Sequence, residues 1–234
     1  MPTIYAATTD GVLYKYIAGT WADARDATSG SALHPWIHNY HSAIRAFHTP
    51  GRGGQVYWCG RCFFAFDTSG ITGTVASATL KLYGLSQDSA DIIAVKATKP
   101  DLSTDIAGAD FDAITGFSAG NTMNGNVTDY SSEITSWSTS GYNDITLNAQ
   151  ALSDMQSGNV LSIAIVEYDH DYPNVAPDNE DLKTGMWFAN EEGTSKDPYI
   201  DYTLSTGGYT HNVLGVAAAN IAKVNGVATA NIDK

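Results

Sequence analysis

The stretch YWCGRCFFAFDTSGITGTVASATLKLY, residues 57–83, decides the fold. Its first part is rich in aromatic residues and ends in FFAFD at residues 63–67. Its last part, ATLKLY at residues 78–83, alternates apolar and polar side chains, which is the period of a half-buried strand. Residues 68–73 between the two parts are turn-forming residues. We therefore expect two consecutive strands joined by a turn, with a β-sandwich built around them.

Further strand-like runs lie on both sides of this pair. They occupy residues 12–17, 91–97, 144–147, 161–165, 186–189 and 199–204. With the central pair they make about nine short strands separated by turn residues, a pattern typical of a sandwich or jelly roll. Residues 99–128 predict a long connection anchored by Phe111, Ile114 and Phe117. The predicted fold class is an all-β antiparallel β-sandwich of jelly-roll type.

One or two short helices are expected beside the strands. Residues 131–137 predict a helical turn, because two apolar side chains three positions apart share one face of a helix. Asn148 is a favourable N-cap for a short helix that ends at Gly158. Residues 22–30 predict a polar surface loop.

The composition describes a folded, acidic chain. Its 234 residues are 43% hydrophobic and 11% aromatic, which is enough to fill a core. Its 12 basic and 25 acidic side chains give a net charge of −13, which disfavours nucleic acid because no basic patch can neutralise phosphates. The N-terminus lacks the features of a signal peptide, and no apolar run approaches the roughly 20 residues that span a bilayer. We expect a protein made in the cytoplasm and not bound to a membrane; a chain whose leader has been removed would look the same.

Two cysteines, Cys59 and Cys62, form a single CxxC. A structural zinc site needs a second pair of ligands. Positions three apart on a strand point to opposite faces, so a disulfide would need a bulge at Gly60. We expect two packed thiols, with a disulfide or a metal site as the alternatives.

The segment HPWIHNYHSAIRAFH, residues 34–48, contains four histidines. Neutral imidazoles bind zinc, and the spacing of the first three histidines suits one face of a helix. Pro35 disfavours such a helix, and the apolar residues of the segment fit a loop packed over the core. A polar and aromatic ligand surface is a further alternative.

Residues 167–181 form an acidic segment near the end of the predicted sandwich. Carboxylates at alternate positions suit Ca²⁺, so Asp169, Asp171 and Asp178 are candidate metal ligands. The segment lacks the glycine spacing of an EF-hand, and a solvated acidic loop is the alternative. A glycosidase pair needs a defined separation between two carboxyl groups, which the sequence does not provide. We therefore assign no catalytic residue and expect a protein that is not an enzyme and has no obligatory cofactor.

The end of the chain is a repeat. Residues 213–223 and 224–234 are two copies of an 11-residue pattern, V-x-G-V-A-x-A-N-I-x-K, and they follow a Gly-Gly hinge at residues 207–208. We expect a sandwich body at residues 1–205 and an extended tail at residues 206–234. An 11-residue period also occurs in right-handed coiled coils, but the glycines and valines count against a helix.

The small apolar side chains of this tail cannot bury a core by themselves. We expect the tail to become ordered by docking on another chain or on copies of itself, and a tail without function is the alternative. The Asn225-Gly226 pair favours a tight turn. The residues expected to make the assembly contacts are Val213, Val216, Ile221, Val224, Val227 and Ile232.

Short motifs spread over roughly residues 10–204 resemble DNRLRE-type modules, which are jelly-roll domains related to the carbohydrate-binding modules of disaggregatases. FFAFDTS with ATLKLY resembles the "LxFDLS … AxLxLY" core of that family. ITSW at residues 134–137, followed by Gly141, resembles its "V..W..G" element. WFANEE at residues 187–192 with PYIDYT at residues 198–203 resembles its closing "F.S.E … PYL.V.Y" pair. The chain departs from these secreted modules in lacking an export signal and in carrying the repeat tail.

The tail resembles the terminal repeats of structural proteins of tailed phages, in which related jelly rolls serve as decoration, head-fibre or tail components. The two resemblances imply a phage virion protein whose partners are other virion proteins or copies of itself in a homo-oligomer. The alternative is a carbohydrate-binding module of an adhesion protein or a polysaccharide-active enzyme, and a tailspike-like hydrolase is a weaker one. Aromatic candidates for stacking on sugar rings are Trp21, Trp36, Tyr40 and Tyr172.

Overall fold

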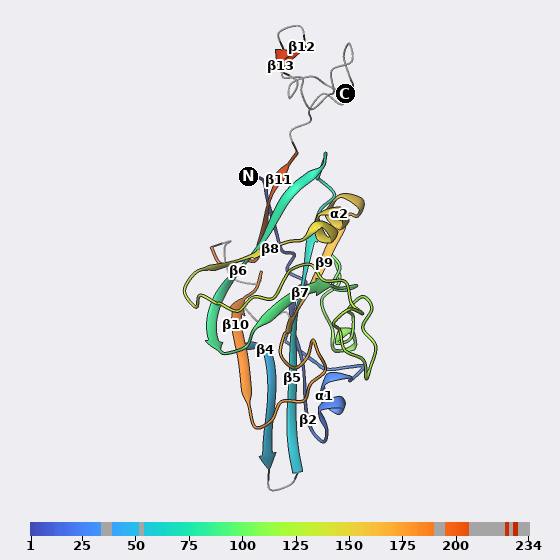
Figure 1. Ribbon diagram of the computed structural model, residues 1–234, viewed down its shortest axis with the longest axis vertical. Coiled ribbons are helices and arrows are strands. Elements are labelled where there is room, and N and C mark those ends of the chain that lie inside the picture. The colour runs from blue at the N-terminus through green and yellow to red at the C-terminus, as the bar shows by residue number, and fades with distance from the viewer. Residues whose placement is uncertain (34–38, 52–53, 190–194, 206–222, 225–226, 229–234) are drawn as a thin grey trace. The chain divides into compact units, whose positions relative to one another are not determined.

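The computed structural model describes the chain except for residues 34–38, 52–53, 190–194, 206–222, 225–226 and 229–234 (Figure 1). The chain divides into two compact units, Met1–Thr203 and Leu204–Lys234, which are called the body and the tail below. Among the described residues, no helix is both long enough and apolar enough to cross a membrane.

The body is an antiparallel β-sandwich of jelly-roll type with two short α-helices, as predicted from the sequence (Figure 1). Its strands are β1 Thr3–Tyr5, β2 Gly11–Ala18, β3 Ser31–Leu33, β4 Asn39–Gly51, β5 Gly54–Asp67, β6 Val75–Asp88, β7 Ile92–Lys96, β8 Tyr142–Thr146, β9 Val160–Glu167, β10 Asp181–Trp187 and β11 Tyr199–Leu204. The predicted central pair corresponds to β5 and β6, the two longest strands of the body.

Strand β5 organises one sheet and strand β6 links it to the other. Along one edge β5 pairs with β2, and along the other it pairs first with β4 and then with β9. The end of β6 joins this sheet through β10, whereas its Thr79–Tyr83 part pairs with β8. We call β1, β11, β8 and the first part of β6 the outer sheet, and the remaining strands the inner sheet.

The inner sheet is covered on both faces. One apolar core lies between the two sheets and contains alternate residues of β5, such as Phe64 and Phe66, with Leu80 and Leu82 of β6. A second core lies on the opposite face of the inner sheet, where Phe63 packs with residues of helix α1 and of the long connection after β7. This double burial explains why β5 carries a continuous apolar run instead of an alternating one.

The long connection after β7 behaves as predicted. Phe111 and Ile114 are buried in the second core, and Phe117 packs against it. This connection and α1 (Trp21–Arg25) cover one face of the inner sheet, whereas Tyr5 of the outer sheet and Tyr16 near the β4–β5 hairpin of the inner sheet are exposed.

The second helix is also where it was predicted. Helix α2 (Ala149–Ser157) begins after Asn148, whose side chain accepts hydrogen bonds from the N–H groups of Gln150 and Ala151, and it ends at Gly158. Within α2, Ala151 and Met155 are buried and face the core between the sheets.

Three local predictions were wrong. Residues 131–137 are extended, not helical, because Ile134 pairs with Ile92 beside β7. The predicted loop at residues 22–30 begins with part of α1, which Thr20 caps together with Asp23. The predicted loop at residues 34–48 contains the start of β4, which pairs with β5 and β10, while residues 34–38 lie outside the described residues.

The two cysteines are free thiols, as predicted, and they belong to different cores. Cys62 packs between the two sheets, whereas Cys59 packs on the opposite face of β5. Burial raises the pKa of both thiols well above the usual value. Two side chains on opposite faces of a strand cannot share a disulfide or a metal ion.

In the tail, β12 (Lys223–Val224) pairs in antiparallel register with β13 (Val227–Ala228), with Val224 opposite Val227. The predicted turn at Asn225-Gly226 lies between them, outside the described residues, as do Val213, Val216, Ile221 and Ile232.

Candidate functional site

A continuous row of aromatic rings, which we call the aromatic row, crosses the solvent face of the outer sheet and ends at Trp187 on strand β10 of the inner sheet. In order of contact, its members are Tyr5, Tyr199, Tyr142, Tyr83 and Trp187. Neighbouring ring centroids are 5.7, 4.9, 5.1 and 6.5 Å apart. Three of the four contacts are edge-to-face, so the rings stand at angles to one another and do not form a closed stack.

Strand register brings these rings together from distant parts of the sequence. Tyr5 on β1 lies opposite Tyr199 on β11, and Tyr83 on β6 lies opposite Tyr142 on β8. In both β6 and β11 the neighbouring residues point into the core, as Leu82 and Ile200 do. The two-residue period of a strand therefore sends these tyrosines to the outer face.

Two surface grooves meet at Tyr142. A groove of about 440 Å³ is lined by Met1, Thr3, Tyr5, Tyr142, Ser195, Tyr199 and Asp201. A second groove, of about 640 Å³, is lined by residues 133–138 and by Tyr142, Asn143 and Asp144. Tyr142 is held in place because its hydroxyl donates to the carbonyl oxygens of Ser195 and Asp197.

Polar groups border the aromatic row. The Lys81 ammonium donates to the Asp144 carboxylate over 2.6 Å, and the Thr3 hydroxyl donates to the Asp201 carboxylate over 2.6 Å. At the other end of the row, the Lys196 ammonium lies 3.6 Å from the centroid of the Trp187 ring. Partial burial and the nearby Asp201 charge raise the pKa of Tyr199, so its phenol is neutral at physiological pH. The row thus combines ring faces with hydrogen-bond donors and acceptors.

A second aromatic group, which we call the Trp58 stack, lies on the inner sheet toward the β4–β5 hairpin. Tyr14 from β2 stacks on Trp58 with centroids 4.5 Å apart. The Arg45 guanidinium from β4 lies 4.8 Å from the Trp58 centroid and 4.6 Å from the Phe47 centroid. Since β2 and β4 flank β5 on opposite sides, the two faces of the Trp58 ring are both occupied.

Gly60 makes this stack possible. It lies opposite both Tyr14 and Arg45, and a Cβ atom there would lie 3.4 Å from the Trp58 indole nitrogen. Without a side chain at Gly60, the two neighbouring side chains lean over Trp58. The Trp58 stack is therefore internal packing and offers no free ring face of Trp58.

The predicted sugar-stacking residues that the structure describes are buried or partly buried and do not form an exposed site. Trp21 and Tyr172 are only 5% and 4% exposed, so their rings are not available to a ligand. The Tyr172 hydroxyl donates to Asp129 over 2.8 Å, and its ring stacks on Tyr168. Tyr40 is half-buried and packs against the core between the sheets, and Trp36 lies outside the described residues.

The three predicted calcium ligands are also separated. Asp171 is fully buried, and both of its carboxylate oxygens accept hydrogen bonds from Arg61 over 2.7 Å. Arg25 is equally buried and lies 3.3 Å from the same carboxylate. Asp171 is thus neutralised by arginine and is not available to a metal ion, and Asp178 is an exposed loop residue.

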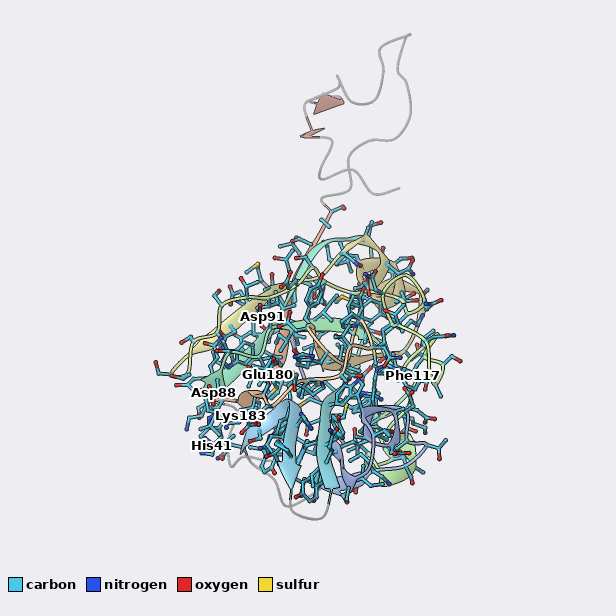
Figure 2. The ribbon with its side chains drawn as sticks, turned by 60° about the horizontal axis from the view of Figure 1, so that its bottom comes forward. His41, Asp88, Asp91, Phe117, Glu180 and Lys183 are labelled. Carbon is cyan, nitrogen blue, oxygen red and sulfur yellow. The ribbon has the colours of Figure 1, made fainter. Side chains whose placement is uncertain are left out.

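Asp169 instead faces Asp91 and Glu133, with ligand atoms within 4.8 Å of one another. Partial burial and mutual repulsion raise the pKa of Asp91 and of Glu133. Asp91 lies on one side of the body with Glu180 and Lys183, across from Phe117 (Figure 2). Among the described residues, this group brings together three carboxylates that could bind a cation. It shares only Asp169 with the predicted set.

Glu167 shapes the loop that carries these residues. Its fully buried carboxylate accepts hydrogen bonds from the N–H groups of Asp169, His170 and Asp171. Burial raises the pKa of Glu167 to about 7, although the three N–H donors oppose that shift. Buried hydrogen bonds to Glu167 therefore hold the acidic segment in shape. Its carboxylates are not all solvated, in contrast to the alternative prediction of a solvated acidic loop.

The aromatic row was not predicted from the sequence, although part of the signal was present. Tyr83 belongs to the polar face of the alternating run at residues 78–83, and Tyr199 belongs to the closing strand. Neither position shows by itself which rings become neighbours. That information lies in the register between strands far apart in the chain.

No family model matches the chain, and no curated protein sequence is significantly similar to it. The resemblances to DNRLRE-type modules and to phage structural proteins remain predictions.

Proposed function

We propose that the body is a non-enzymatic carbohydrate-binding module whose site is the aromatic row. The observation that carries this proposal is the groove of about 440 Å³ walled by Tyr5, Tyr142 and Tyr199. Sugar rings have apolar C–H faces that stack on aromatic side chains, and hydroxyl groups that need polar partners. The Asp201 carboxylate lines the groove and can accept hydrogen bonds from sugar hydroxyl groups. The row contains five rings in sequence, so several of them could contact successive sugars of a polymer.

We further propose that this module is displayed on a phage virion, as a decoration, head-fibre or tail component, and that the tail mediates its assembly. The support is the repeated tail sequence, the short antiparallel pair β12–β13 within it, and its division from the body. In this proposal the body contacts polysaccharide at the host surface, and the tail contacts copies of itself or another virion protein.

The glycan proposal is tested by affinity electrophoresis and pull-down of the full chain with soluble and insoluble polysaccharides. Tyr142→Ala removes the ring shared by both grooves, and we expect retention to fall by roughly tenfold or more, as is usual for loss of a buried contact. Tyr142→Phe keeps the ring and removes only the hydroxyl, so it should retain most of the binding.

The matched control is Tyr16→Ala. Tyr16 is 56% exposed but lies beside the Trp58 stack, away from both grooves. Binding should be unchanged in this variant. If the wild-type chain is retained by no polysaccharide, or if both alanine variants lose binding equally, the aromatic row is not the site.

The assembly proposal is tested by deleting residues 207–234. The body should remain folded by circular dichroism, and light scattering should show a smaller oligomer than the full chain forms. A truncated chain that assembles like the full chain would exclude a role of the tail in assembly.

A further inference from the structure

The charged side chains that line the two grooves beside the aromatic row are all carboxylates. Asp201 lines the smaller groove, and Glu133 and Asp144 line the larger one. Glu133 and Asp144 are exposed, and Asp201 is partly exposed, so a ligand can reach each of them. Asp144 is paired with Lys81, whereas Asp201 has no cationic partner among the described residues. The smaller groove therefore holds a negative charge that the described chain does not compensate.

Met1 also lines the smaller groove, but it does not neutralise Asp201. Its side chain is 82% exposed, and its α-amino group forms no ion pair with a described carboxylate.

Asp201 lies on the same face of the outer sheet as the Tyr5–Tyr199 ring pair. In the β1–β11 ladder, Thr3 lies opposite Asp201 and Tyr5 lies opposite Tyr199. The two pairs are two residues apart along each strand, so their side chains share one face at a spacing of roughly 7 Å. The Thr3 hydroxyl donates to Oδ1 of Asp201, and Oδ2 accepts no hydrogen bond from the described residues. A sugar ring stacked on either tyrosine therefore has an open carboxylate oxygen beside it.

The far end of the aromatic row shows that these rings accommodate an ammonium group. The Lys196 ammonium lies 3.6 Å from the Trp187 centroid and 5.8 Å from the Tyr83 centroid. The attraction comes from the negative face of an aromatic ring. Over Tyr5 and Tyr199, the described chain places no cation of its own. The near end of the row thus offers ring faces and a carboxylate to an ammonium group that a ligand would supply.

The charge of the chain narrows the class of polysaccharide further. With a net charge of −13 and carboxylates in both grooves, the protein repels polymers of uronic acids. A neutral sugar can donate a hydroxyl to Asp201. An ammonium group forms a charge-assisted hydrogen bond there, which is roughly twice as strong.

We propose that the polysaccharide bound at the aromatic row contains hexosamine units with free, protonated amino groups, and that Asp201 selects them. One unit stacks its C–H face on Tyr5 or Tyr199, and its ammonium group donates to the carboxylate oxygen that Thr3 leaves open. This inference rests on the proposed function and names the substrate class of that site.

The test is isothermal titration of the full chain with two tetrasaccharides of the same linkage, one of glucosamine and one of N-acetylglucosamine. The two ligands share the sugar ring but differ in charge, so the comparison isolates the ammonium group. We expect the glucosamine tetrasaccharide to bind roughly tenfold more tightly. The difference should shrink at high salt, because ions screen an interaction that is partly exposed to solvent.

Asp201→Asn removes the charge, while the side-chain oxygen of asparagine can still accept from Thr3. The variant should fold, lose the preference for glucosamine, and bind the acetylated tetrasaccharide nearly as well as the wild type does. The matched control is Asp178→Asn, which changes the net charge equally at an exposed residue that lines neither groove. This control should leave both affinities unchanged.

The outcomes separate this inference from the proposed function. Equal binding of the two tetrasaccharides, lost for both in Tyr142→Ala, would overturn the inference and leave the proposed function intact. Retention of other polysaccharides without binding of the glucosamine tetrasaccharide would do the same, whereas retention of no polysaccharide would overturn both.

Two further outcomes concern the role of Asp201 and the source of the ammonium group. An equal loss of glucosamine binding in Asp178→Asn would assign the preference to the net charge of the chain and overturn the role of Asp201. Tetralysine carries ammonium groups without sugar rings and should bind more weakly than the glucosamine tetrasaccharide. Equal or tighter binding of tetralysine would identify a protein amine as the ligand and overturn the proposed substrate class.

Discussion

The aromatic row and the Trp58 stack contain the same kinds of side chain but are built differently. In the Trp58 stack, a tyrosine and an arginine from the two flanking strands cover both faces of one indole. In the aromatic row, rings meet mostly edge to face, and two grooves open beside Tyr142. Aromatic content alone is thus a poor guide to ligand binding, because the chain's own side chains can satisfy the rings first.

The charged groups show the same contrast. On the far face of the inner sheet, Asp171 is enclosed by Arg61 and Arg25 without solvent contact. Phe111 and Phe117 lie against the Arg61 guanidinium, 4.5 and 4.8 Å from its central carbon. Beside the outer sheet, Lys81 and Asp144 form their pair at the surface. The far face of the inner sheet is therefore a closed region, stabilised by its own contacts, and the outer sheet is an open region, where we propose that the ligand binds.

The largest expected effect comes from breaking the closed region at Asp171. Asp171→Asn keeps the size of the side chain but leaves the buried Arg61 guanidinium without the carboxylate to which it donates, whereas Arg25 keeps its contact with Asp26. We expect a loss of roughly 3–5 kcal/mol in the free energy of unfolding, as for other broken buried ion pairs. Urea denaturation measures it, and Asp144→Asn, which breaks the surface pair with Lys81, is the control, with an effect of about 0.5 kcal/mol. Equal effects would show that the two regions do not differ.

Trp58→Ala tests whether the Trp58 stack serves packing alone. We expect a loss of roughly 2–3 kcal/mol, below the 3–5 kcal/mol of a fully buried large aromatic residue, because Trp58 is only partly buried. Polysaccharide retention at a temperature where the variant is folded should equal that of the wild type. Loss of retention in Trp58→Ala would place the ligand on the inner sheet instead.

Glu167 is expected to make the stability of the closed region depend on pH. Its pKa in the folded state, about 7, lies above the ordinary value of 4.5. A carboxyl group with a raised pKa stabilises the fold below its unfolded pKa, and this contribution is lost as pH rises through the folded value. We therefore expect the urea midpoint of the wild type to decline between pH 5 and pH 8, in the window set by these two values.

The control for this pH dependence is Glu167→Gln, which cannot ionise. The variant is expected to be less stable at low pH, because an amide replaces one acceptor oxygen with a donor, and its midpoint should vary less over the same window. An equal slope in the two proteins would assign the pH dependence to other groups.

The smallest effect is expected at Glu133, which lines the larger groove of the open region. Desolvation, and then repulsion from Asp91 and Asp169, raises the pKa of Glu133, so removing its charge relieves that repulsion at neutral pH. Glu133→Gln should raise the melting temperature by about 1–2 °C at pH 7 and leave it unchanged at pH 3, where the carboxyl groups are protonated. A fall at pH 7 would mean that the carboxylate makes a favourable contact that outweighs the repulsion.

Local sequence patterns were sufficient where local physics decides the structure. The alternation at residues 78–83 predicted β6, the cap residue Asn148 predicted α2, and the three-residue spacing of Cys59 and Cys62 predicted that they do not pair. Each of these predictions depends on a few neighbouring residues whose backbone geometry sets where side chains point.

Residues 131–137 show where this reasoning fails. Their apolar spacing suits a helix, but β7 offers them backbone partners, and tertiary pairing with Ile92 decides in favour of an extended chain. Trp21 and Tyr172 fail for a similar reason: an aromatic residue in a polar segment looks exposed, yet each lies in the second core that the long connection creates.

By itself, the sequence of this protein determined an all-β sandwich, the strands at its centre, an acidic chain and a repeat at its end, because these follow from periodicity, charge and self-similarity along the chain. Only the tertiary structure decided which aromatic rings face solvent, which carboxylates are neutralised by arginine, and where pockets form. The physical reason is that these properties depend on register and layering between segments far apart in sequence, as when Tyr5 meets Tyr199 and Asp171 meets Arg61.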